Sequence, residues 1–393
     1  MHADPAGGGR VLASPATMGS EASAQSGRRR WAGRLALLAA SALVGLFAAE
    51  LALRALGVAP ERWAEARSLE RGDKRLVLDL YPDDPRDYFP IDLRDGAVRA
   101  SYRERGLPEV DARFQRTPHG VDLRFGPELC RGGAIEAAPS GAARVVVVGD
   151  SFTEGQGVRE EDTFAAHLGR ALGDRAQVIN CGRRGYDFPE LRELFARHLA
   201  LAPDVVVYAM VLNDPQRSEA FTARQRYIDD WILDRRRMVS EGDGAPPPWT
   251  PRLFALVGDR IEGMRVGAET TRWYREMVSG ENREGWEATL AHVEAMHAAM
   301  RERGGALVVA LWPLLVELDG EYPFEATHRV IGEALEARSI AFVDALPAFR
   351  GRDAAALWVH PSDRHPNERA HAIFAERVEP VVRASVERSG GRS

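Results

Sequence analysis

Runs of consecutive apolar residues, mostly β-branched, recur along the chain from residue 144 onward. Runs without polar alternation indicate strands that are buried on both faces, as in a parallel sheet. The runs occupy residues 144–148, 177–180, 204–210, 306–312 and 340–343.

Helical patterns separate these runs. Apolar residues spaced three and four apart fill 164–172, after Asp162 as a helix cap, and 191–199, after Pro189. Strand, helix and strand at this spacing indicate right-handed βαβ units. We therefore predict an α/β fold over residues 141–385, a three-layer α/β/α sandwich with a mainly five-stranded parallel sheet.

The segment from about 215 to 285 interrupts the alternation of strands and helices. It contains Pro246-Pro247-Pro248 and several tryptophans. We predict an insertion at the carboxyl edge of the sheet, where open α/β folds place their sites. Insertions of this kind often shape the access of a substrate.

An uncharged apolar run at residues 35–49 follows four arginines near the start of the chain. As a helix it covers about 22 Å, less than a hydrocarbon core of roughly 30 Å. Extension to Leu53 provides the length but includes Glu50, which Arg54 can pair one helical turn later. The pattern predicts a transmembrane signal anchor over 35–56. A cleaved secretory signal and a cytosolic core helix are the alternatives.

The flanks of the anchor predict its topology. Because arginines precede the apolar run, the N-terminus is expected in the cytoplasm and the remainder of the chain outside it. Residues 1–34 are rich in small residues and are predicted to be a disordered cytoplasmic segment. Residues 57–140 are interpreted as a membrane-proximal lead-in with an edge strand near 119–123. Residues 386–393 are interpreted as a disordered tail.

Composition narrows the classes of partner. The chain has 393 residues, 45% of them hydrophobic, and a net charge of -6. No long basic run lies beyond the first 34 residues, so we expect no nucleic-acid partner. The two cysteines, Cys130 and Cys181, are compatible with one disulfide in an oxidising compartment or with two buried thiols.

Gly149-Asp150-Ser151 directly follows the first buried run. A serine in a sharp strand-to-helix turn is exposed at the carboxyl edge of the sheet, and its own N–H can point at a developing oxyanion. The alternatives are a helix-capping serine and a phosphate-binding loop. Gln156 disfavours the phosphate loop, because the lysine of the P-loop motif is missing after Gly155.

A nucleophilic serine needs a base, and His365 precedes the last helical period. Asp363 could orient this imidazole through Nδ1 and leave Nε2 for Ser151. The alternative is a surface turn in which Asn367 caps the following helix. His360, His365 and His371 match no standard ligand spacing, so we expect neither a metal nor a cofactor.

Two further residues follow the second and third runs. Gly185 permits close backbone approach to a ligand, and the Asn213 amide can donate to an oxyanion. Because the carboxyl ends of parallel strands share one edge, both are expected on the edge that carries Ser151.

The stretch GDSFTEG and the terminal HPN segment, with Gly185 and Asn213 between them, resemble the SGNH (GDSL-type) hydrolase superfamily over about residues 143–385. The resemblance implies a flavodoxin-like sheet, a shallow site without metal, and Ser151 as nucleophile. It also implies an oxyanion hole formed by the Ser151 and Gly185 amides and the Asn213 side chain. His365 would be the base, oriented by Asp363.

The chain departs from that family pattern at two points. The family usually shows Asp-x-x-His, whereas Ser362 stands at that position and the acid is one residue closer. Asp-x-His is similar to the pattern of membrane-associated polysaccharide O-acetyltransferases. Val211 replaces the usual glycine of Gly-x-Asn-Asp.

These features predict a membrane-anchored, extracytoplasmic serine esterase that acts on acyl esters, with O-acetylated glycans among the candidate substrates. One alternative is an O-acyltransferase that delivers the acyl group to a sugar hydroxyl. A second is a non-catalytic glycan-binding module that uses exposed tryptophans, namely Trp231, Trp249, Trp273 and Trp286.

Overall fold

The computed structural model describes residues 18–58, 114–116, 122–126, 128–186, 188–224, 249–360 and 363–390. The chain forms two compact units, one of residues 1–65 with 245–262 and the other of residues 66–244 with 263–393. The first unit holds the apolar N-terminal segment and the second holds the sheet. Each is described separately below.

The second unit is built on a five-stranded parallel sheet with the strand order β4-β3-β5-β6-β7. The central strands β3, β5 and β6 are almost completely buried, as their unbroken apolar runs predict. The strands are β3 (Ala143–Gly149), β4 (Ala176–Asn180), β5 (Val205–Met210), β6 (Ala306–Leu311) and β7 (Ala341–Asp344). The predicted α/β fold with five parallel strands is confirmed.

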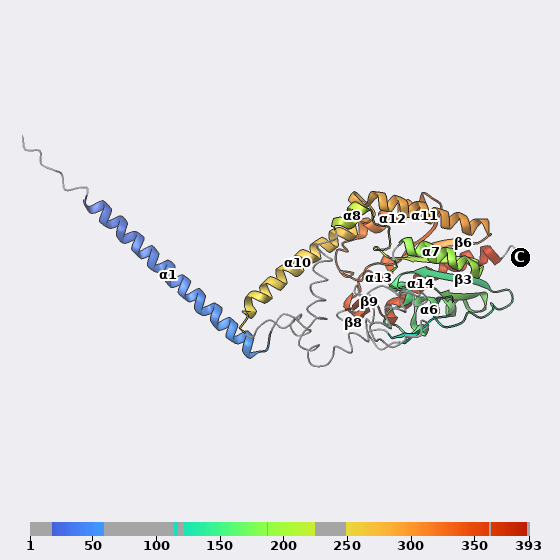
Figure 1. Ribbon diagram of the computed structural model, residues 1–393, viewed down its shortest axis with the longest axis horizontal. Coiled ribbons are helices and arrows are strands. Elements are labelled where there is room, and N and C mark those ends of the chain that lie inside the picture. The colour runs from blue at the N-terminus through green and yellow to red at the C-terminus, as the bar shows by residue number, and fades with distance from the viewer. Residues whose placement is uncertain are drawn as a thin grey trace, which may run out of the picture. The chain divides into compact units, whose positions relative to one another are not determined.

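Helices cover both faces of this sheet (Figure 1). Helices α6 and α14 pack against each other on one face, and α7 and α11 on the other, while α12 packs on β7. Their bounds are α6 (Phe164–Leu172), α7 (Phe188–His198), α11 (Arg283–Glu302), α12 (Glu325–Glu336) and α14 (Glu368–Gly390). Between α14 and the sheet, the Trp312 and Phe374 rings stack with centroids 3.7 Å apart.

Two helix ends differ from the predictions. The cap of α6 is Thr163, whose hydroxyl accepts the Ala166 N–H at 3.3 Å, whereas Asp162 lies in the preceding 3-10 turn. Residues 386–390, predicted to belong to a disordered tail, continue α14 to Gly390. The reason is burial, because Val386 packs in the core and extends the apolar face of the helix.

Smaller elements surround the sheet. The predicted edge strand near 119–123 is instead part of a separate antiparallel pair, β1 (Phe114–Arg116) and β2 (Asp122–Arg124). A second pair, β8 (Trp358–His360) and β9 (Asp363–Pro366), precedes α14. The interrupted segment contributes α8 (Glu219–Arg224) and α10 (Arg252–Glu276). Its triple proline lies outside the described residues.

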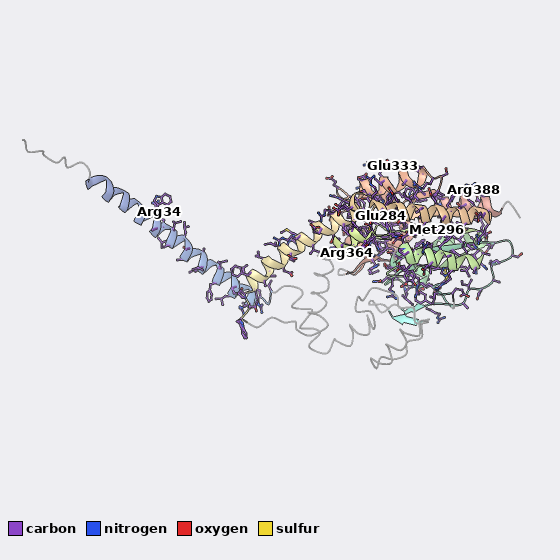
Figure 2. All side chains as sticks on the ribbon, turned by 45° about the horizontal axis from the view of Figure 1, so that its top comes forward. Arg34, Glu284, Met296, Glu333, Arg364 and Arg388 are labelled. Atoms are coloured by element: carbon purple, nitrogen blue, oxygen red, sulfur yellow. A yellow bond between two sulfur atoms is a disulfide. The ribbon has the colours of Figure 1, made fainter. Side chains whose placement is uncertain are left out.

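The first unit contains α1 (Met18–Ala55) and the beginning of α10. Residues 18–34, predicted to be disordered, are helical, because helix extends from the apolar segment into residues with good helix propensity. The part Trp31–Ala55 is long and apolar enough to cross a membrane or to serve as a signal sequence. Most of its apolar side chains are exposed, as Figure 2 shows around Arg34.

Candidate active site

The turn after β3 presents Ser151 as the first residue of the short helix α5 (Ser151–Glu154). A Cβ atom at Gly149 would lie 2.1 Å from Thr153 Oγ1 and 2.6 Å from the Ala209 carbonyl oxygen, so only glycine fits. The Asp150 carboxylate accepts the Phe152 N–H at 2.9 Å and caps α5. Gly149 and Asp150 therefore define this turn together with the close approach of Ala209 from β5.

His365 lies on β9 and reaches Ser151 across 214 positions of sequence. Its Nε2 is 2.8 Å from the Ser151 Oγ. On the other side of the ring, Nδ1 is 3.3 Å from the side-chain nitrogen of Gln156. In the sequence Gln156 only disfavours a phosphate loop, and no motif there marks it as a neighbour of the imidazole.

Asn367 holds the hairpin of His365 against α14. Its Nδ2 donates to the Trp358 carbonyl oxygen at 3.2 Å, and its Oδ1 accepts the Ala370 N–H at 3.2 Å. The Phe152 ring packs beside the His365 ring with centroids 5.5 Å apart. The predicted capping role of Asn367 therefore accompanies the placement of His365 and does not compete with it.

Asp363 and His371, the other residues considered together with His365, are described to different extents. The backbone of Asp363 lies on β9, opposite His360, but its side chain lies outside the described part of the structure. Its contact with the imidazole therefore stays a prediction. His371 is buried in the core, where Nδ1 accepts the Phe164 N–H at 3.1 Å and burial lowers the pKa of the imidazole to about 3.

Asn213 lies after β5, and its side chain is near enough to the buried carboxyl group of Asp150, beside Ser151, to favour the charged form of that group. Burial raises the pKa of Asp150 to about 6, although the Phe152 N–H, the nearby His365 and the Asn213 amide favour the charged form. A primary amide carries two N–H donors. One of them can face Asp150, which leaves the other for a second acceptor.

Asp214 closes the turn that carries Asn213. Its buried Oδ2 accepts the Tyr208 hydroxyl at 2.9 Å and the Val211 N–H at 3.0 Å. Burial and the charge of Asp150 raise the pKa of Asp214 well above its usual range. Val211 is not among the described residues with positive φ, so the turn forms without the family's glycine.

Gly185 lies in the loop after β4 with a φ of 74°, a conformation that favours glycine. The preceding residue, Arg184, donates its N–H to Glu154 Oε2 at 3.1 Å, and its side chain forms a 3.0 Å ion pair with the same carboxylate. Glu154 is fully buried at the end of α5. The sequence did not predict these contacts between Glu154 and Arg184, although Glu154 stands three residues after Ser151 in the same motif.

Arg131 holds the loop that follows α5. Its buried guanidinium donates to the carbonyl oxygens of Gly155, at 3.0 Å, and of Glu154 and Val158. Burial lowers the pKa of this arginine. No motif signals this contact in the sequence, because its partners are backbone atoms.

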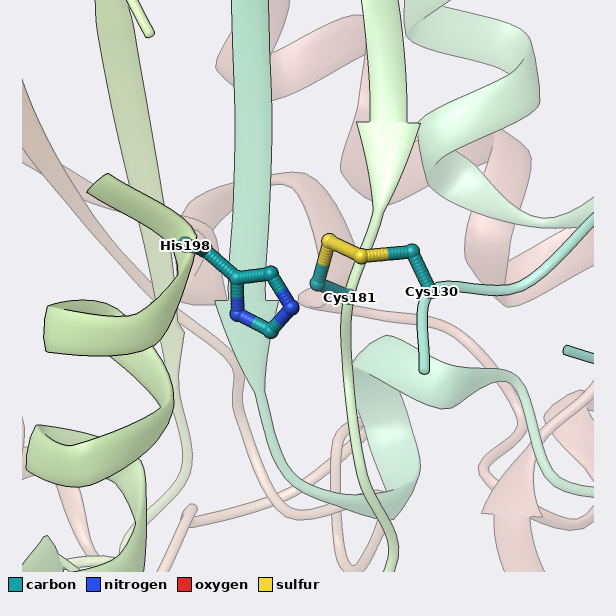
Figure 3. A group of neighbouring side chains, drawn as sticks. All are labelled: Cys130, Cys181 and His198. Carbon is teal, nitrogen blue, oxygen red and sulfur yellow. A yellow bond between two sulfur atoms is a disulfide. The ribbon is translucent and has the colours of Figure 1, made fainter. Parts of the chain in front are cut away.

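A disulfide joins Cys130 to Cys181, which resolves the alternative left by the sequence (Figure 3). Cys181 follows β4 and begins the loop that leads to Gly185. His198 lies beside the two sulfur atoms, but its ring nitrogens are 2.7 and 3.0 Å from backbone carbonyl oxygens. Disulfide sulfurs are not thiolates, so this group does not provide a zinc-type ligand set.

The tryptophans proposed for sugar binding have unlike surroundings. Trp286 is buried in the core, and Trp273 is half-buried and stacked on Phe221 with centroids 6.0 Å apart. Trp249 is 79% exposed and belongs to the first unit. Trp231 lies outside the described residues, so the described tryptophans do not indicate a common sugar-binding surface.

Comparison with solved structures finds several similar chains. An acetylxylan esterase from Geobacillus stearothermophilus is 14% identical, with coverage of 61% of this chain and 94% of that one and a TM-score of 0.38. The protein TesA is 17% identical, with coverage of 61% and 97% and a TM-score of 0.38. An alpha/beta hydrolase from the metagenome of Lake Arreo, Spain, is 15% identical, with coverage of 62% and 95% and a TM-score of 0.36. At these scores none of them bears on the substrate of this chain.

The comparison with curated proteins gives no match. A family model is more informative, because it covers the turn of Ser151, most of the sheet and the hairpin of His365 together. The model of the GDSL-like lipase/acylhydrolase family matches residues 147–373, more than half of the chain. The chain therefore belongs to the GDSL-like lipase/acylhydrolase family.

Proposed function

We propose that the chain is a serine esterase that hydrolyses carboxylic esters through an acyl-enzyme on Ser151. The observation that supports this most directly is the 2.8 Å distance between Ser151 Oγ and His365 Nε2. That distance lies within the range for direct proton transfer from a nucleophile to its base.

In the proposed reaction, Ser151 Oγ attacks the acyl carbon and passes its proton to His365 Nε2. The tetrahedral intermediate collapses, the ester oxygen takes the proton from His365, and the alcohol leaves. Water then attacks the acyl carbon and passes a proton to His365, which returns it to Ser151 Oγ as the carboxylic acid leaves.

Three donors are proposed for the oxyanion, namely the N–H groups of Ser151 and Gly185 and the second amide N–H of Asn213. The nearness of the Asn213 amide to the buried Asp150 carboxyl group supports this role, because the electrostatic interaction between them orients the amide before substrate binds. The bond from Arg184 to Glu154 supports it for Gly185, since it restrains the adjacent peptide.

The base must carry a proton on Nδ1 for Nε2 to accept one from serine. We assign the orientation of this proton to the Asp363 carboxylate, as the Asp-x-His pattern suggests. The side-chain nitrogen of Gln156 lies 3.3 Å from Nδ1 on the same side of the ring. With the amide group flipped, the side-chain oxygen of Gln156 would face Nδ1 instead.

We further propose that α1 is retained as a membrane anchor, with the hydrolase unit outside the cytoplasm. The Cys130–Cys181 disulfide supports an oxidising compartment. Glu50 and Arg54 supply hydrogen bonds to residues 250–253, which cleavage of the segment would remove. That dependence supports an anchor over a transient signal sequence.

The test is labelling of the purified full chain with a fluorophosphonate, followed by ester hydrolysis assays. We expect an adduct on Ser151 and no turnover by Ser151→Ala. Unlabelled Ser151, or full activity in that variant, would refute the proposal. Acetylated glycans compared with short and long nitrophenyl esters would define the acyl group. Product analysis with an added oligosaccharide would separate hydrolysis from acyl transfer.

A further inference from the structure

We propose that the first turns of α10, together with Trp249 before it, lie in the interface of the lipid bilayer that α1 spans. This inference rests on the membrane anchorage proposed above and extends it to a second segment. It concerns only the first unit, in which residues 245–262 accompany the N-terminal segment.

The beginning of α10 is bonded directly to the end of α1. Glu50 accepts the Arg252 N–H through Oε1 at 3.1 Å and the Leu253 N–H through Oε2 at 3.0 Å. Arg54 donates to Glu50 at 2.7 Å and to the Thr250 carbonyl oxygen at 2.9 Å. An acidic residue in the apolar segment thus satisfies the unpaired N–H groups of another helix.

The bonds also run in the other direction. The Arg252 guanidinium donates to the carbonyl oxygens of Leu53, at 3.2 Å, and Val58, at 3.1 Å. The Val58 N–H also donates to the Leu53 carbonyl oxygen, at 2.9 Å, so Arg252 adds a second bond at the end of α1. If α1 spans a bilayer, α10 must therefore begin at the level where α1 leaves the hydrocarbon.

The outer face of these first turns is apolar. Phe254, Val257 and Ile261 are spaced by three and four residues, which places them on one side of the helix, and they are 66%, 49% and 42% exposed. Trp249, 79% exposed, stands just before the helix. Tryptophan is enriched at membrane interfaces, because its ring is apolar while its N–H can hydrogen-bond to water or headgroups.

The dimensions also fit an interfacial segment. From Phe254 to Ile261 the helix rises about 10 Å, so the stripe is too short to span a bilayer. Exposed Arg260 lies about a quarter turn around the helix from the middle of the stripe, where its charged group can stay on the water side of the lipid headgroups. In the proposed arrangement α1 is surrounded by lipid, and the start of α10 is bonded to α1. Lipid therefore lies next to this stripe, which favours a lipid surface as its partner.

The experiment uses the full chain in phosphatidylcholine vesicles. Because both native cysteines are in the disulfide, a single introduced cysteine takes a thiol-reactive fluorophore alone. The variants are Val257→Cys and Ile261→Cys on the stripe, and Arg260→Cys as the matched control. Fluorescence is quenched either by lipid-borne nitroxide or by aqueous iodide. Fluorophosphonate labelling checks that each variant is folded.

We expect lipid nitroxide to quench the labels at 257 and 261 several-fold more than the label at 260, with iodide giving the opposite order. Equal access of iodide to all three labels would overturn the inference. So would protection of 257 and 261 from both quenchers, which would indicate a protein partner such as a second copy.

Carbonate extraction of the vesicles separates this inference from the anchorage on which it rests. If the chain resists extraction while iodide reaches the stripe, only the interfacial placement of α10 fails. If carbonate releases the chain, the anchor itself fails and the inference falls with it. Esterase activity is unaffected by either result.

Discussion

The two sides of the proposed reaction centre are built in different ways. Ser151 stands in a turn that a few neighbouring residues define, from the glycine at 149 to the αL cap at Gly155. His365 stands on a two-stranded hairpin whose position depends on Asn367 and on packing against Phe152. The turn of the proposed nucleophile thus depends mainly on neighbouring residues, with one close approach from Ala209, whereas the proposed base requires the folded chain.

The buried charges are also distributed unequally. On the serine side, Asp150, Glu154 and Arg131 are all buried and bonded to turns that follow the strands. On the histidine side, Asn367 is neutral and half-buried, and Arg364 is exposed. We expect substitutions on the serine side to alter catalysis through the turns, and substitutions near α14 to act mainly on stability.

The largest expected effect tests whether the two sides act as one unit. Ser151→Ala and His365→Gln should each lower kcat by roughly 10⁴- to 10⁶-fold, because either change removes the nucleophile–base pair. The double variant should be no slower than the slower single variant. Steady-state hydrolysis of a soluble ester measures this, and losses that multiply would show independent roles.

Removal of the disulfide tests how far the serine side depends on a covalent bond. Cys130→Ser with Cys181→Ser opens a link between residues 51 apart, which should lower the free energy of unfolding by about 4 kcal/mol. Urea unfolding in detergent measures the change. Reduced wild-type protein is the control, and equal stability with and without reductant would contradict the prediction.

Asn213→Ala tests the proposed oxyanion donor. The loss of one such donor should lower kcat by about 10²- to 10³-fold. Fluorophosphonate labelling of Ser151 should persist, because the nucleophile and base remain. A fall in labelling as large as that of Ser151→Ala would indicate collapse of the turn instead, since the Asn213 side chain also lies close to Asp150.

Glu154 tests whether a residue without contact to the serine hydroxyl affects catalysis through the Gly185 loop. Glu154→Ala removes the acceptor of the Arg184 N–H and should lower kcat roughly 10- to 100-fold, the worth of a hydrogen bond to a charged group, with little change in KM. Glu154→Gln keeps an acceptor and should restore most of the rate.

Arg184→Ala is the matched control for Glu154, because it removes the ion pair but keeps the backbone N–H. Its kcat should fall much less than that of Glu154→Ala. Equal losses would assign the effect to the ion pair, and a raised KM with unchanged kcat would place it in substrate binding.

The smallest effect concerns pH on the histidine side. Burial lowers the pKa of His371 from 6.5 to about 3, so below pH 6.5 the unfolded chain binds a proton that the folded chain does not. The contribution of His371 to stability is therefore complete above pH 6.5 and decreases as the pH falls toward 3. From pH 7 to 5.5 the loss is about 1 kcal/mol.

His371→Phe should be less stable at neutral pH, because the Phe164 N–H loses its acceptor. Its stability should nevertheless fall less steeply between pH 7 and 5.5 than that of the wild type. Urea unfolding at both pH values measures the two slopes. Parallel slopes would show that His371 is protonated in the folded state.

Several features could be predicted from sequence because they depend on near neighbours. Unbroken β-branched runs identified the five strands, and glycine followed by Asp150 identified the turn of Ser151. The terminal asparagine was also identifiable as a helix cap. Each of these signals arises from backbone conformation, hydrogen bonding or burial within a few residues.

Other features were not predictable in this way. The sequence left open whether Cys130 and Cys181 pair, and it gave no sign that Glu154 holds the loop of Gly185 or that Glu50 caps α10. Asp162 was taken as the cap of α6 although Thr163 makes the bond. In all but the last case the partners lie far apart in sequence, and no pattern along the chain encodes their distance.

The sequence by itself determined the order of strands and helices, the apolar N-terminal helix and the turn that exposes Ser151, since these follow from periodicity, propensity and local steric fit. Only the tertiary structure decided that His365 Nε2 reaches Ser151 Oγ and that the turns of Asn213 and Gly185 are held by buried carboxyl groups. The physical reason is that a hydrogen bond depends on separation in space, and 214 residues of chain leave that separation to the packing of the sheet and its helices.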